Sequence, residues 1–104
     1  MTAVEDITVQ PTENPNCRVY NTRYELSSVP ERGYRGCPGE LGAFGQLVLE
    51  VDGVVQVTIG PYVLVIDKAP LFSWEDVEGY KDSEGGVLFL LSEFVRSQRV
   101  SVEM

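Results

Sequence analysis

Two runs of β-branched and aliphatic residues, joined by a tight corner, constrain the fold of this chain more than any other feature. "VVQVTI" at 54–59 and "YVLVID" at 62–67 are separated only by Gly60 and Pro61. Such runs favour strands, and a two-residue Gly-Pro connection predicts an antiparallel hairpin. Because both runs are apolar on both faces, we expect them in the centre of a sheet. Strict alternation puts three residues of the first run on one face: Val55, Val57 and Ile59.

Two further strands are expected before the hairpin. Residues 4–9 are short and β-leaning, and residues 17–26 alternate between two mixed faces, with threonine and tyrosine residues that suit a pleated surface. Between them, the prolines and asparagines of "PTENPN" predict a turn. Residues 27–40 contain two prolines among several glycines and are predicted to be a long loop.

Helical spacing appears in two other places. Apolar residues recur every three or four positions over 40–51, which predicts an amphipathic helix. A second helix is expected to begin after Ser73, with Asp76 completing a capping box, to be interrupted around 81–86, and to resume before a frayed tail. The prediction is an α+β domain in ββαββα order: a largely antiparallel four-stranded sheet packed by two helices.

Composition narrows the classes of function. The 104 residues suit one domain spanning 1–104, and no apolar run is long enough for a membrane span. The start lacks the basic and apolar pattern of a signal peptide, so we expect a cytoplasmic protein with no membrane partner. A net charge of −8 with scattered basic residues argues against nucleic-acid binding. The absence of histidine removes the usual general base and metal ligand, so we expect no enzyme activity.

The candidate site residues each have a structural alternative. Cys17 and Cys37 are interpreted as free thiols, with Cys37 more exposed and Cys17 packed at a strand start. Arg32, Tyr34 and Arg35, in "RGYRG", are residue types common in interface hot spots, or else belong to a solvated loop. Six carboxylates offer a weak attraction for Fe²⁺, although capping and solvation of a helix explain them better: Asp67, Glu75, Asp76, Glu78, Asp82 and Glu84.

Several segments, in this order, resemble the N-terminal domain of the NifU-like (Nfu) iron–sulfur scaffold proteins. They are the T-x-N-P-N-x stretch at 12–17, the "VDGV" turn at 51–54, the hairpin at 57–68 and Trp74 after a polar turn. The likeness covers about residues 4–95. It implies the fold, and a non-catalytic accessory or docking role in iron–sulfur cluster assembly with a scaffold or client protein as partner.

The chain also departs from that family's pattern. Full-length members join this domain to a second one whose C-x-x-C pair binds the cluster, whereas nineteen residues separate Cys17 from Cys37 here. No tightly bound cofactor is therefore expected, and transient contact with iron or a cluster at these cysteines stays open. A stand-alone interaction or regulatory domain unrelated to iron is the alternative, because a fold does not fix a function.

Overall fold

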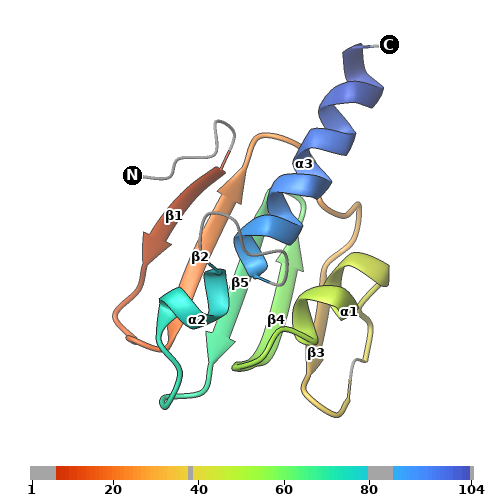
Figure 1. Cartoon of the computed structure of the whole chain (residues 1–104). Helices are drawn as coiled ribbons and strands as arrows, with labels where there is room; N and C mark the ends of the chain where they lie inside the picture. Colours follow the sequence, from red (N-terminus) through yellow and green to blue (C-terminus); the bar gives the residue numbers. More distant parts are fainter. Residues whose placement is uncertain (1–6, 38, 80–85, 104) are drawn as a thin grey trace.

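One antiparallel sheet of five strands, in the order β1-β2-β5-β4-β3, organises the part of the chain that the computed structural model describes, residues 7–37, 39–79 and 86–103. The helices α1, α2 and α3 accompany it (Figure 1). The strands are β1 (Ile7–Pro11), β2 (Cys17–Thr22), β3 (Glu31–Tyr34), β4 (Val54–Gly60) and β5 (Val63–Lys68), and the helices are α1 (Ala43–Leu49), α2 (Trp74–Glu78) and α3 (Val87–Glu103).

The predicted hairpin is present and lies inside the sheet, as its two apolar faces require. β5 is the central strand, between β2 and β4. The corner differs by one residue from the prediction, because Gly60 pairs with Val63 and the connecting residues are Pro61 and Tyr62. A register shift between Val54 and Gln56 also changes which residues of β4 point to which face of the sheet. Three residues of β4 are therefore buried together, Val54, Val57 and Ile59, while Val55 remains 38% exposed.

The prediction of four strands was wrong by one. β3 lies inside the stretch 27–40 that was predicted to be loop, and it pairs with β4 so that Gly33 faces Val57. An edge strand needs a hydrogen-bonding partner on one side only, so it tolerates the neighbouring glycines and prolines that a central strand would not. The loop after β3 covers its outer edge, since Glu40 donates its backbone N–H to Arg32 and Cys37 exchanges backbone bonds with Tyr34.

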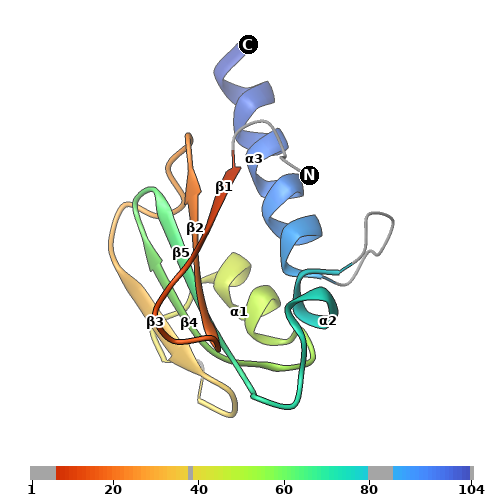
Figure 2. The same ribbon diagram turned by 90° about the vertical axis from the view of Figure 1, so that its left-hand side faces the viewer.

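The three described helices pack on one face of the sheet, and no helix of the described residues lies on the opposite face (Figure 2). α1 is shorter than the predicted helix at 40–51. The expected interruption separates α2 from α3, although most of its residues lie outside the described part of the chain. The core between helices and sheet consists mainly of aliphatic residues and Tyr20: Ile7, Tyr20, Leu26, Leu41, Val48, Leu49, Val51, Val54, Val57, Ile59, Leu64, Ile66, Val77, Val87, Leu91 and Val95.

Backbone contact explains why a glycine precedes α3. Gly86 is buried, and a Cβ there would overlap the backbone carbonyl of Glu78 at the end of α2. α3 then continues to Glu103, so the expectation of a frayed tail was wrong. No glycine or proline follows Gly86 to end the helix. None of the described helices is both long and apolar enough to cross a membrane.

Candidate functional site

The T-x-N-P-N segment is a closed turn held by its own side chains. The Thr12 hydroxyl accepts from the backbone N–H of Asn14 at 3.1 Å and donates to the carbonyl of Cys17 at 3.0 Å. Asn14 Oδ1 accepts from the backbone N–H of Asn16 at 2.8 Å. Such local bonds are the reason that asparagine and threonine favour turns. The segment is thus a shaped entry into β2, as its composition predicts.

Lys68 and Trp74 fix this turn to the rest of the protein. Lys68, only 7% exposed at the end of β5, donates from Nζ to Asn16 Oδ1 at 2.9 Å. Trp74, the first residue of α2, donates its indole N–H to the carbonyl of Pro15 at 2.9 Å. The Lys68 ammonium also lies 5.6 Å from the Trp74 ring centroid, a favourable cation–π distance. Trp74 therefore anchors the start of α2 to the 12–17 turn.

A polar triad joins β2 to the end of α2. Glu78 Oε2 accepts from Arg18 Nη1 and from the Tyr20 hydroxyl, both at 2.7 Å. Burial, and then the bond to Glu78, raise the pKa of Tyr20 above its ordinary value. The Arg18 guanidinium lies 4.8 Å from the centroid of the Trp74 ring. Sequence reasoning assigned Glu78 to a solvated helix face and missed this triad, since its partners are about sixty residues away.

In the part of the chain that the structure describes, one face of the sheet carries no helix (Figure 2). Because side chains alternate along each strand, the strand registers define which of them point to this face. We call it the open sheet face. Its centre consists of three half-buried valines, Val19, Val63 and Val65. Its other members are mostly polar: Thr8, Gln10, Cys17, Asn21, Arg32, Tyr34, Gln56, Thr58 and Asp67.

The three partner-binding candidates in "RGYRG", which are Arg32, Tyr34 and Arg35, do not share one location. Arg32 and Tyr34 both point to the open sheet face from the edge strand β3, and Tyr34 is 50% exposed. Arg35 has a structural role. Its guanidinium donates to the carbonyl oxygens of Val54 at 2.7 Å, Leu49 at 3.1 Å and Val51 at 2.6 Å.

Arg35 thereby satisfies carbonyl groups where α1 ends and the chain turns into β4. Sequence reasoning placed all three residues together as partner-binding candidates. In the structure, Arg32 and Tyr34 share the open sheet face, whereas the hydrogen bonds of Arg35 explain that residue by a structural role.

The two cysteines are free thiols on different parts of the sheet. Cys17 begins β2 and is half-buried; burial and then the Asp67 carboxylate raise the pKa of its thiol. Cys37 is exposed in the loop after β3. Cys17 and Cys37 are four strand-to-strand steps apart, through Asp67, Gln56 and Tyr34, or roughly 19 Å at about 4.8 Å per step. Within one chain they therefore do not share a metal ion.

The acidic candidates do not form a metal site in the described residues. Asp76 completes the predicted capping box: its carboxylate accepts from the backbone N–H of Ser73 at 3.0 Å, and the Ser73 hydroxyl accepts from the backbone N–H of Asp76 at 3.1 Å. These bonds hold the pKa of Asp76 below its ordinary value. Asp82 and Glu84 lie outside the described residues. Among the residues that the structure describes, no three His, Cys, Asp or Glu side chains are grouped as metal ligands.

Comparison with known proteins supports the fold and nothing beyond it. No family model matches the sequence. No curated protein matches it either. Among solved structures, the X-ray crystal structure of protein SAV1430 from Staphylococcus aureus is similar, with a TM-score of 0.55 and 19% sequence identity over 68% of this chain and 87% of that chain. The class that fold and comparison define is therefore an α+β domain with an antiparallel sheet.

Proposed function

We propose that this chain is a non-catalytic docking domain associated with iron–sulfur cluster assembly, and that it binds a scaffold or client protein through the open sheet face. The observation that carries the proposal is this uncovered face, which combines three central valines with Arg32 and Tyr34 at one edge. A surface with an apolar centre and a polar rim is typical of protein interfaces.

The contacts of the polar side chains support a docking role more than a catalytic one, because these side chains bind other parts of the fold. The most connected polar groups, which are Lys68, Arg18, Glu78 and Arg35, each hold one element against another. A catalytic site requires acids, bases or nucleophiles that converge on a substrate pocket. Here the same groups stabilise the fold, and burial and the Asp67 carboxylate raise the pKa of the Cys17 thiol, which disfavours the reactive thiolate.

The association with iron–sulfur assembly is supported by the way in which the family-like segments fold. Lys68 and Trp74 are 52 and 59 residues away in the chain from the turn residues that they bind, Asn16 and Pro15. Residues whose order resembles the Nfu N-terminal domain thus form a single structural unit. Such a unit is expected if the resemblance reflects a shared fold with a shared use.

Anaerobic reconstitution with iron and sulfide tests whether the chain holds a cluster by itself. The wild-type chain is compared with Cys17→Ser and Cys37→Ser by visible absorption. We expect no cysteine-dependent charge-transfer band in any of the three, because the two thiols lie too far apart to bind one cluster. A band that either substitution abolishes would overturn the docking proposal in favour of a cluster-carrying protein, with a second chain supplying ligands.

A genetic assay tests the association with iron–sulfur assembly. Deletion of the gene in its source organism is expected to lower the specific activity of a [4Fe–4S] dehydratase in extracts. The wild-type gene should restore this activity, and the double substitution Arg32→Ala with Tyr34→Ala should not. Unchanged dehydratase activity after deletion would instead favour the alternative, an interaction or regulatory domain unrelated to iron.

A further inference from the structure

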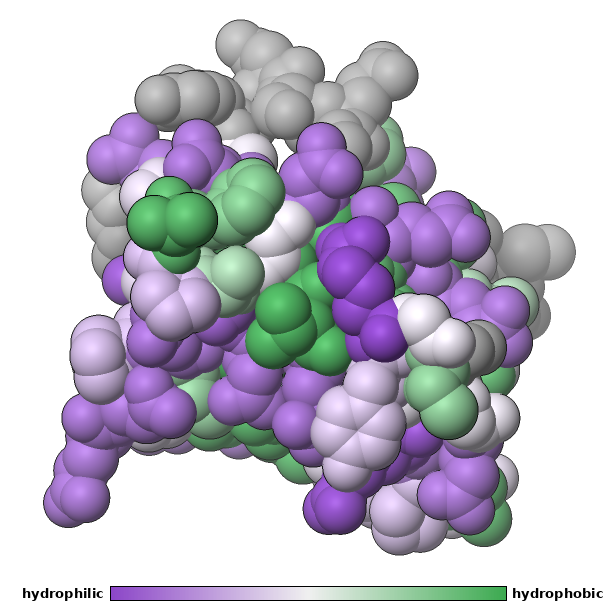
Figure 3. Space-filling view, turned by 90° about the horizontal axis from the view of Figure 1, so that it is seen from below, coloured by the Kyte–Doolittle hydropathy of each residue, from purple (hydrophilic) through white to green (hydrophobic). Residues whose placement is uncertain are grey.

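One end of the molecule exposes apolar side chains from three separate segments. Figure 3 looks onto this end, where hydrophobic surface lies between hydrophilic regions. Leu71 is 97% exposed, Tyr34 is 50%, Val55 is 38% and Phe72 is 36%. We call these four residues the distal strip. Large apolar side chains gathered in this way mark interaction sites more often than scattered ones do.

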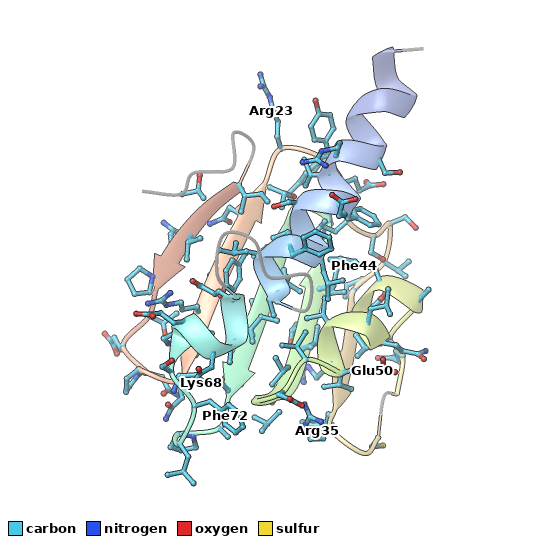
Figure 4. The ribbon with its side chains drawn as sticks, viewed as in Figure 1. Arg23, Arg35, Phe44, Glu50, Lys68 and Phe72 are labelled. Carbon is cyan, nitrogen blue, oxygen red and sulfur yellow. The ribbon has the colours of Figure 1, made fainter. Side chains whose placement is uncertain are left out.

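Contacts between neighbouring segments bring the backbone of the strip's residues together at this end. The Phe72 ring covers Gly53, so that a Cβ on that glycine would lie within 3.0 Å of three Phe72 side-chain atoms. Val55 follows two residues after Gly53, and its carbonyl accepts from the backbone N–H of Arg35 at 2.9 Å, next to Tyr34. Figure 4 shows Phe72 and Arg35 at this same end, far from Arg23.

The backbone of the most exposed residue of the strip, Leu71, lies in a hydrogen-bonded turn. The backbone N–H of Phe72 donates to the carbonyl of Ala69 at 3.1 Å, which closes a β-turn with Pro70 and Leu71 at its corners. The capping box of α2 begins at the next residue, Ser73. Because the backbone is already ordered, binding has to restrict only the side chain of Leu71, so Leu71 is suited to be an anchor in a partner's pocket.

The charges around the strip indicate the chemistry of the partner. Glu50 and Asp52 are exposed at the end of α1 and in the turn before β4. Arg35 also borders the strip, but its guanidinium is directed to three carbonyl groups. The whole chain carries a net charge of −8. Complementarity therefore favours a cationic partner and opposes self-association of two such chains.

We propose that the distal strip is the docking site for a basic, amphipathic segment of a partner protein, with Leu71 as its anchor. This inference rests on the proposed docking role and not on iron. In such a complex Leu71 and Phe72 meet aliphatic side chains, while lysine or arginine residues of the partner face Glu50 and Asp52.

Titration of the full chain with a synthetic amphipathic Leu/Lys peptide, followed in amide chemical shifts, tests the inference. The control probe is a Leu/Glu peptide with the same apolar pattern. We expect saturable shifts centred on Leu71, Phe72 and Val55 with the Leu/Lys peptide, a dissociation constant that rises with salt, and no binding of the Leu/Glu peptide. Leu71→Ala should raise the dissociation constant by about 10- to 100-fold without changing stability, because the side chain is already in water.

A control variant and three refuting outcomes complete the test. Tyr62→Ala removes another exposed large side chain, 53% exposed, from the β4–β5 turn at the other end of the strands and should leave the dissociation constant unchanged. Equal binding of both peptides, or no effect of Leu71→Ala, would refute the inference. So would a dimer in sedimentation that Leu71→Asp abolishes, since the occupant would then be a second copy. None of these outcomes alters the iron-dependent assays of the proposed function.

Discussion

Substitution of Glu78 by alanine removes the acceptor that Arg18 and Tyr20 share. Both bonds are 2.7 Å long, and the Glu78 side chain is only 15% exposed. The Tyr20 hydroxyl belongs to a fully buried residue, so losing its partner costs about 1–3 kcal/mol of desolvation that is no longer offset. The lost charge-assisted bond to Arg18 adds a smaller amount, since that guanidinium is 30% exposed. We expect the free energy of unfolding to fall by about 2–4 kcal/mol.

Urea denaturation followed by circular dichroism measures this loss. For a domain of this size the expected change is a fall in the midpoint by roughly 1–3 M urea at unchanged slope. Glu93→Ala is the matched control, because its 2.8 Å pair with Arg96 lies on the surface of α3 with side chains 49% and 70% exposed. That pair should contribute no more than about 0.5 kcal/mol.

A double-mutant cycle with Tyr20→Phe isolates the Tyr20–Glu78 bond. In the phenylalanine background no buried hydroxyl is left without a partner, so Glu78→Ala should cost about 1 kcal/mol less than in the wild type. If the two losses add within about 0.5 kcal/mol, the bond does not stabilise the protein and the reasoning is refuted. The same holds if Glu78→Ala proves as mild as the surface control.

Two other changes test the capping box and the turn before β4. Because the pKa of Asp76 is lowered in the folded protein, its contribution to stability should be present above its ordinary pKa of about 3.9 and disappear as pH falls through the lower folded value. Urea midpoints of the wild type and of Asp76→Asn should therefore converge at acid pH, and a pH-independent difference would contradict the assignment. Gly53→Ala should destabilise by about 2 kcal/mol or more, since Gly53 combines a φ of +93° with direct contact to Phe72, whereas Gly36→Ala, at φ +86° with open space around it, reports backbone strain alone. Equal thermal unfolding of these two variants would show that the Phe72 contact does not matter.

Features encoded by neighbouring residues were predicted well. The alternation of residues 54–67 fixed a central hairpin, and the spacing of Ser73 and Asp76 fixed a helix start, because each depends on bonds within a few residues. The same applies to the turn at 12–17, whose hydrogen bonds are local. Hydrogen bonds between residues a few positions apart determine the local structure, so the sequence pattern is enough to predict it.

Tertiary structure decided the rest. β3 exists because β4 offers it an edge, not because "ERGY" favours a strand. The register shift that exposes Val55 depends on how β4 meets β5.

Likewise, Arg35 binds carbonyls up to nineteen residues away, and Glu78 meets partners about sixty residues away. Periodicity and spacing describe neighbours along the chain, whereas these bonds form only once separate elements have packed together. The sequence by itself therefore determined the α+β class and its local turns and caps. Packing alone decided which charged side chains hold separate elements together and which lie exposed on the surface.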